Sequence, residues 1–176
     1  MPIKVLVAYA SRAGSTKGIA EFVGGKLQRD GVQTDVRDVG SIADASSYDA
    51  FVIGSALYMY HWLKEAREFV SRNRSVLAGR PVWLLSSGPT SLEKTDKKGR
   101  NLLEVMGPKE IDELRGLTNP RDHRVFYGAF YPDHLKGALG FFARAAPKDE
   151  VGDFRNWSEI EAWTNEIAEA LGQRGK

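Results

Sequence analysis

Apolar residues along the chain follow two alternating spacings, one typical of buried strands and the other of amphipathic helices. Residues 4–10 form an almost continuous apolar run, as expected of a parallel strand that is covered on both faces. A helical stripe with the spacing i, i+3, i+4 and i+8 follows, at Ile19, Phe22, Val23 and Leu27. The pair Asp30-Gly31 is a helix stop signal. This segment therefore predicts a strand, a loop and a helix, which is half of a βαβ unit.

The same alternation continues to the end of the chain. Four more apolar runs predict strands at residues 32–39, 50–55, 81–86 and 125–130. Helices are predicted at residues 62–73, at about 108–117, and from Asn156 or Ser158 to about Leu171. Five strands that alternate with helices, joined by right-handed crossovers, predict an α/β fold. We expect a three-layer, doubly wound domain with a five-stranded parallel sheet.

Two longer segments interrupt the alternation, at residues 89–119 and 131–153. Segments of this length inside a compact domain are usually functional or partly disordered. We interpret residues 1–176 as a single domain, in which about residues 131–153 are inserted before the last helix.

Composition and charge exclude several classes of function. The chain has no cysteine, which excludes disulfides, thiolate catalysis and cysteine-bound metals. His123 and His134 lie in predicted loops without partners at ligand spacing, so we expect no metal site. The net charge of +2 is too small to indicate a nucleic-acid partner. No apolar stretch reaches the ~20 residues that span a bilayer, and no signal-peptide pattern opens the sequence, so we expect a cytoplasmic protein.

The loop after the first strand has the residues of a phosphate site. It reads Ser11, Arg12, Ala13, Gly14, Ser15 and Thr16, and it leads directly into the first helix. Backbone N–H groups at a helix start favour an anion, the hydroxyls add donors, and the glycine allows a close approach. Neither a Walker lysine motif nor Gly-x-Gly-x-x-Gly is present, which argues against nucleoside triphosphates and dinucleotides. An ordinary capped helix start is the alternative interpretation.

Two further loops are expected at the same edge, because the carboxyl ends of parallel strands meet there. Residues 54–62 are dense in aromatic rings, and residues 86–90 are small, with backbone amides free to bind the rim of a ligand. Together they suit a flat aromatic cofactor. We expect Tyr58 and Met59 to contact it, and Trp62 to anchor the following helix in the core.

These residues make the chain resemble flavodoxins, and more closely the flavodoxin-like, menaquinone-dependent protoporphyrinogen dehydrogenases of bacterial haem synthesis. Beyond residues 11–16, the resemblance is carried by Tyr48-Asp49, Val52-Ile53-Gly54, His61, Phe69-Val70, Gly128-Ala129, Tyr131-Pro132 and Trp157. It extends from the first strand to about Leu171. Residues 58–61 depart from it, since they read Tyr-Met-Tyr-His where the dehydrogenases carry Arg-Tyr-Gly-His.

The resemblance implies strand order 2-1-3-4-5 and FMN as the cofactor, with its phosphate at residues 11–16. It also implies that the isoalloxazine ring contacts Ala56, Leu57, Tyr58, Met59, Ser87, Gly88, Pro89 and Thr90. A deazaflavin has a similar shape and is an alternative cofactor. The implied activity is that of a flavin-dependent oxidoreductase, which passes electrons from an organic donor to a quinone or similar acceptor. A non-enzymatic electron carrier between protein partners is the alternative, although such carriers tend to be strongly acidic.

The sequence allows two interpretations of His61 and two of residues 135–146. His61 is the only histidine near the expected cofactor edge, where it would relay a proton as a catalytic residue or serve as a structural residue at a helix start. Residues 135–146 mix apolar bulk with two cations. This segment would contact a membrane or form a flap packed over the sheet, and we expect the packed flap.

Overall fold

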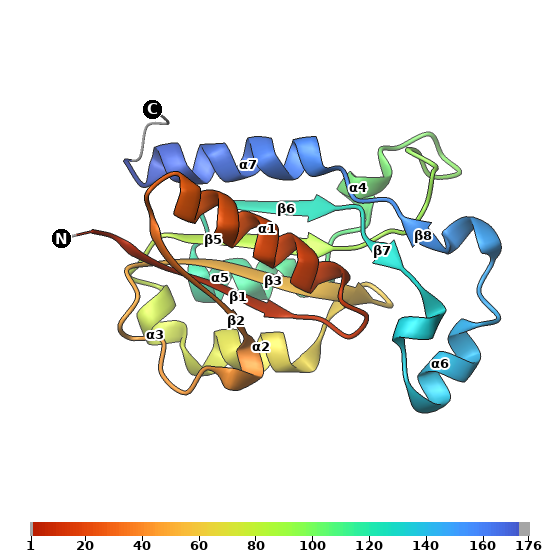
Figure 1. Cartoon of the computed structure of the whole chain (residues 1–176), viewed down its shortest axis with the longest axis horizontal. Coiled ribbons are helices and arrows are strands. Elements are labelled where there is room, and N and C mark those ends of the chain that lie inside the picture. Colours follow the sequence, from red (N-terminus) through yellow and green to blue (C-terminus); the bar gives the residue numbers. More distant parts are fainter. Residues whose placement is uncertain (1, 173–176) are drawn as a thin grey trace.

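A parallel sheet forms the centre of the molecule, with helices on both of its faces (Figure 1). A computed structural model of the chain describes residues 2–172. The sheet has the order β2-β1-β3-β5-β6, with β1 (Lys4–Ala10), β2 (Gln33–Asp38), β3 (Ala50–Tyr58), β5 (Val82–Ser87) and β6 (Asp122–Phe126). The predicted three-layer, doubly wound fold and the order 2-1-3-4-5 of its five parallel strands are therefore confirmed.

Successive residues of each central strand point to opposite faces of the sheet, and both faces are covered. In β1, Val5 and Val7 belong to one core cluster, whereas Leu6 and Ala8 belong to the other. The first cluster lies under α1 (Ser15–Arg29) and α7 (Trp157–Ala170). The second lies under α2 (Lys64–Arg72), α3 (Arg74–Leu77) and α5 (Ile111–Thr118). Two short helices, η1 (Val39–Ser41) and α4 (Leu102–Val105), complete the connections.

The last helix brings its first residues to the edge where the strands end. Of the two predicted starts, Asn156 is the N-cap, because its side chain accepts a hydrogen bond from the Glu159 N–H at 3.3 Å. Further along α7, Trp163 packs edge-on against Phe126, with 5.5 Å between ring centroids. The α7 helix runs back across the sheet, so the segment that precedes it lies beside the carboxyl ends of the strands (Figure 1).

The last strand of the sheet lies earlier than the apolar pattern predicts. The β6 strand spans Asp122–Phe126 rather than residues 125–130, so His123 lies in a strand and not in a loop. Its first residues are polar because β6 is an edge strand, where charged side chains are common. Ala129–Phe130 instead forms β7, which pairs antiparallel with β8 (Gly152–Asp153) in a separate two-stranded sheet. The two ends of the inserted segment are therefore held side by side.

The predicted aromatic loop after β3 is a hairpin. The β3 strand continues past Ser55, and β4 (His61–Trp62) pairs antiparallel with its end. Met59 and Tyr60 connect the two strands with φ angles of 53° and 65°. A two-residue connection with both φ angles positive is typical of a type I′ turn. The α2 helix begins two residues later than predicted, at Lys64, because Trp62 belongs to β4.

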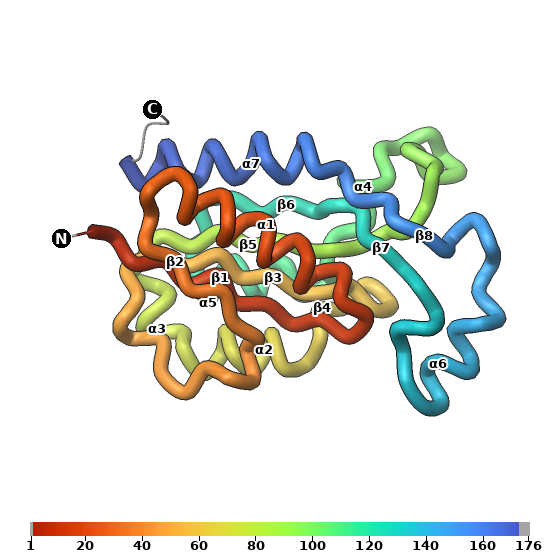
Figure 2. The backbone as a smooth tube through the Cα atoms, in the orientation of Figure 1, coloured from red at the N-terminus to blue at the C-terminus, as the bar shows by residue number. Residues whose placement is uncertain are grey.

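The insertion, residues 131–153, forms an excursion beyond the carboxyl edge of the sheet (Figure 2). It contains η2 (Pro132–His134), α6 (Gly137–Ala143) and η3 (Lys148–Glu150). The α6 helix packs mainly against η2, and Phe141 and Phe142 are 72% and 73% exposed. The expectation that residues 135–146 form a flap packed over the sheet is therefore wrong. None of the helices within residues 2–172 combines the length and the apolar character needed to cross a membrane.

Candidate functional site

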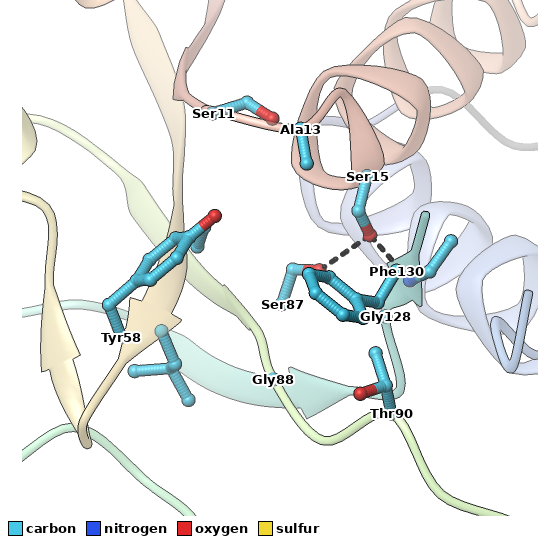
Figure 3. A pocket seen from close by; sticks show the side chains of 12 residues that line it. Ser11, Ala13, Ser15, Tyr58, Ser87, Gly88, Thr90, Gly128 and Phe130 are labelled. Carbon is cyan, nitrogen blue, oxygen red and sulfur yellow. Dashed lines mark hydrogen bonds between the residues drawn. The ribbon is translucent and has the colours of Figure 1, made fainter. Parts of the chain in front are cut away.

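A pocket of about 120 Å³ opens at the carboxyl edge of the sheet (Figure 3). Nine of the residues predicted to bind the cofactor line it: Ser11, Ala13, Ser15, Ala56, Leu57, Tyr58, Ser87, Gly88 and Thr90. Five predicted residues do not: Arg12, Gly14, Thr16, Met59 and Pro89. Three further residues, which the sequence reasoning did not assign to the site, also line it: Gly128, Ala129 and Phe130. The ends of β1, β3 and β5 thus converge as predicted, and the chain after β6 adds a fourth wall.

The predicted phosphate loop, residues 11–16, leads directly into the start of α1. Gly14 has φ 91°, a left-handed conformation that favours glycine, and its N–H donates to Ser11 Oγ at 3.1 Å. The first turn of α1 contains no acidic side chain, so its exposed N–H groups and the positive end of its dipole are available to an anion. Among the buried side-chain nitrogen and oxygen atoms of residues 2–172, only Thr16 Oγ1 has no hydrogen-bond partner. An unpaired buried hydroxyl of this kind is costly in free energy.

A hydrogen-bonded clamp joins three of the pocket walls (Figure 3). Ser15 Oγ lies 3.1 Å from Ser87 Oγ and accepts a hydrogen bond from the Ala129 N–H at 2.8 Å. Gly128 sits against this clamp, because a Cβ there would lie 3.2 Å from both hydroxyl oxygens and from the Gly88 carbonyl oxygen. A Cβ at position 128 would therefore require these neighbours to move by a few tenths of an ångström.

Tyr58 provides the aromatic wall of the pocket (Figure 3). Burial raises the pKa of its phenol, so the ring is neutral near pH 7. The Arg12 guanidinium lies over the outside of this ring, 5.7 Å from the centroid. Met59, which was predicted to contact the cofactor beside Tyr58, is 85% exposed at the tip of the hairpin. The hairpin therefore presents one aromatic face to the pocket and one flexible apolar side chain to solvent.

The backbone of the loop after β5 is less free than predicted. The Gly88 N–H donates to the Phe126 carbonyl at 2.9 Å, and the Pro89 carbonyl accepts from the Gly128 N–H at 3.0 Å. These bonds fasten the loop to the end of β6. Its polar contribution to the pocket therefore comes from Ser87 and from Thr90, whose side chain lies at the pocket wall (Figure 3).

Trp62 is a core anchor, as predicted. Its side chain is 1% exposed, and its Nε1–H donates to Ser86 Oγ at 2.8 Å. Ser86 Oγ also lies 2.9 Å from His123 Nε2. Burial lowers the pKa of His123 to about 4, so its imidazole is neutral near pH 7 and pairs with the hydroxyl without a buried charge. This partly buried network joins the hairpin to β5 and β6.

His61 is placed for a structural role. Its Nδ1 pairs with Glu110 Oε1, and the same carboxylate accepts a bond from the Trp62 N–H at 3.4 Å and lies 3.5 Å from Arg67. His61 does not line the pocket. The side chain instead ties the hairpin to the start of α5. Within residues 2–172, no group of three metal-binding side chains occurs.

A second hollow of about 140 Å³ lies on the outer side of the phosphate loop. The loop contributes Ala13, Gly14 and Ser15, and the other wall consists of Ala129, Tyr131, His134 and Arg155. The sequence reasoning missed Arg155, because only the pairing of β7 with β8 brings residue 155 back to the loop. No local pattern signals this approach.

Comparison with known proteins agrees with this arrangement. The sequence model of the flavodoxin domain matches residues 6–144. The chain belongs to the flavodoxin domain family. Membership indicates a flavin-binding redox protein. Among characterised relatives, the chain is 31% identical over 81 residues to "Protoporphyrinogen IX dehydrogenase [quinone]" of Escherichia coli K12. That match covers 45% of each protein, so the chain spans less than half the length of the curated relatives it matches.

Solved flavodoxins share the fold at low sequence identity. A flavodoxin from the domain Archaea has a TM-score of 0.60 at 18% identity, covering 97% of this chain and 99% of its own. A cysteine-to-serine mutant of the flavodoxin from Pseudomonas aeruginosa gives 0.61 at 17% identity with the same coverage. Oxidised flavodoxin 2 of Bacillus cereus gives 0.60 at 19% identity, covering 95% of this chain and 99% of its own. At such identities these matches support the fold alone.

Proposed function

We propose that this protein is an FMN-dependent oxidoreductase that passes electrons from an organic donor to a quinone or similar small-molecule acceptor. The observation that carries the proposal is the buried, unpartnered hydroxyl of Thr16, in the first turn of α1 and next to an aromatic-walled pocket. A phosphate at this helix start gives that hydroxyl a partner. FMN has both the phosphate and the flat ring system that such a site requires.

The described residues fit FMN in their chemistry. Ser11, Ser15 and Thr16 offer hydroxyls to a phosphate, and the backbone N–H groups of the first turn offer the rest of the donors. Tyr58 offers a neutral ring face to the isoalloxazine, while Ser87 and Thr90 offer hydroxyls to its polar rim. Bound FMN supplies hydride or electron transfer, and the protein positions it and excludes water.

Charge and similarity favour an enzyme over an electron carrier. The chain carries a net charge of +2, whereas a carrier relies on a strong field of one sign to dock with its protein partners. The E. coli relative that it matches in part is named as a quinone-dependent dehydrogenase. A small-molecule donor and acceptor are therefore the better match than two redox proteins.

The first experiment identifies the cofactor. We expect purified protein to be yellow and to release FMN, identified by its visible spectrum and by mass spectrometry. Release of a deazaflavin would correct the cofactor but keep the site. A colourless protein that does not take up added FMN would overturn the proposal. For the reaction, turnover of an organic donor with a quinone as acceptor, without any protein partner, would support an enzyme, and transfer only to a redox protein would indicate a carrier.

A substitution at Thr16 tests the phosphate position. Thr16→Val removes a hydroxyl that has no partner within the protein, so the free energy of unfolding of the apoprotein should hardly change. Loss of one bond to a charged ligand should weaken FMN binding ~10-fold, measured by fluorescence titration. Thr118→Val is the matched control, because Thr118 Oγ1 donates to the Leu114 carbonyl at 2.8 Å on the opposite face. The control should lose stability and keep its FMN affinity.

A further inference from the structure

The insertion returns to the sheet directly beside the phosphate loop. After β8, Arg155 lies against the first turn of α1, where its Nη1 donates to the Ser15 carbonyl at 3.3 Å. It lines the outer hollow together with Ala13 and Gly14 of the loop. Gly18 leaves room for this approach, because a Cβ at that position would lie 2.5 Å from Arg155 Nη1. A residue 140 positions away in the sequence is thus in contact with the predicted phosphate site.

Three contacts fix the orientation of the Arg155 guanidinium. Asp153 accepts two bonds from it, at 2.8 Å to Nε and 2.6 Å to Nη2. The ring of Trp157 lies under it, 4.6 Å from Cζ. The side chain is 15% exposed, and the hydrogen bonds from Arg155 lower the pKa of Asp153, so this carboxylate is charged near pH 7. A guanidinium held in this way loses little conformational entropy when an anion binds nearby.

The charge distribution around the loop gives this arginine a role. Bound phosphate concentrates about two negative charges at the start of α1, where the helix supplies only partial positive charges. Of the two basic side chains that line the outer hollow, Arg155 is held in place by its contacts, whereas His134 lies on the exposed surface of η2. Arg12, the other cation of the loop, is exposed over Tyr58.

We infer that Arg155, delivered by the insertion, is a specificity-determining residue that makes the site select the phosphate-bearing flavin over the phosphate-free one. The inference rests on the proposed function. Arg155 stabilises the bound phosphate through its charge and through its hold on the Ser15 carbonyl, which orients the first turn of α1. The insertion thereby contributes to cofactor recognition from a segment that the sequence separates from the loop.

The test compares FMN with riboflavin, which lacks the phosphate, as probes of the apoprotein. Wild-type protein should bind FMN more tightly than riboflavin. Arg155→Gln should weaken FMN binding ~10-fold while changing riboflavin affinity less than ~2-fold, since only FMN carries the phosphate that the guanidinium stabilises. Arg155→Lys keeps the charge and should recover part of the FMN preference. In the wild-type protein, the preference should decrease as salt is raised, because salt screens the charge.

The matched control is Arg124→Gln. Arg124 also pairs with an aspartate two residues earlier, with its Nε 2.7 Å from Asp122 Oδ2, but it lies in β6, away from both hollows around the loop. The control should leave the FMN-to-riboflavin ratio unchanged. If Arg155→Gln leaves the ratio of FMN to riboflavin affinity unchanged, whether both affinities fall equally or neither falls, the inference is overturned. Wild-type protein that binds riboflavin as tightly as FMN would overturn the inference and the phosphate contact of Thr16 but leave a flavin-dependent activity standing, whereas failure to bind either flavin would overturn the proposed function.

Discussion

Two segments at the carboxyl edge of the sheet hold their aromatic residues in opposite ways. The hairpin of β3 and β4 buries Trp62 at 1% exposure and ties its indole to Ser86. The insertion leaves Phe141 and Phe142 more than 70% exposed on a helix that packs mainly against its own neighbouring turn. An aromatic residue at this edge is therefore part of the core only where a second element supplies a partner. Such partners anchor the hairpin, whereas the insertion is held at its base by the pairing of β7 with β8.

Removal of the hairpin anchor should have the largest effect. Trp62→Ala leaves a cavity and removes the donor to Ser86, so the free energy of unfolding should fall by about 3–5 kcal/mol. Urea denaturation followed by circular dichroism measures this loss. A change below about 1 kcal/mol would mean that the hairpin is not anchored through Trp62, and the contrast with the insertion would disappear.

Acid should lower the stability of the protein through His123, which belongs to the hydrogen-bonded network of Trp62. The pKa of His123 is lowered to about 4 in the folded protein, whereas an unfolded histidine titrates near 6.5. The unfolded chain therefore binds a proton first, and stability decreases as pH falls from about 6.5 to about 4, by at most about 3 kcal/mol from this group. His123→Gln should flatten this part of the pH profile of unfolding. A pH profile that keeps its slope in His123→Gln would contradict this assignment.

Because the hairpin tip is strained, residues that suit its turn should raise the free energy of unfolding by a moderate amount. Met59 and Tyr60 both have positive φ angles, which side-chain-bearing residues adopt at a cost. The double substitution Met59→Asn and Tyr60→Gly gives the turn its preferred residues and should stabilise the apoprotein by about 1 kcal/mol in the same urea assay. Alanine at both positions keeps the strain and serves as the comparison. Equal stability of the two double variants would show that the turn is unstrained.

The insertion should show the smallest effect. Phe141→Ser combined with Phe142→Ser changes two exposed side chains, so the free energy of unfolding should change by less than about 0.5 kcal/mol. A loss of more than about 2 kcal/mol would indicate that these rings are buried in solution, for example between two copies of the chain. Sedimentation of both proteins would then identify the assembly.

Local pattern predicted most of the fold, because buried parallel strands must be apolar along their whole length. Prediction from local pattern failed where contacts with distant parts of the chain determine the structure. The start of β6 is polar because the strand lies at the sheet edge, and the turn at Met59 and Tyr60 lacks the glycine or asparagine that usually signals a hairpin. The exposure of α6 could not be predicted from its residues, since the same apolar content occurs in buried helices.

The candidate site was predictable to the extent that it consists of contiguous loops. Residues 11–16 follow a strand and start a helix, so their place at the carboxyl edge follows from the fold. Gly128 and Arg155 reach the site through strand pairings that no short motif encodes. Their roles depend on the distance between chain segments, which sequence spacing alone does not give.

The insertion is a structurally separate segment, because its two ends pair with each other. Since Ala129–Phe130 and Gly152–Asp153 lie side by side, the chain leaves and re-enters the domain at one point. The residues between these two ends make no strand pairing with the main sheet, so a change in their length need not alter its register. Asp153 and Arg155, at the end where the chain returns, are the residues that connect the insertion to the first turn of α1.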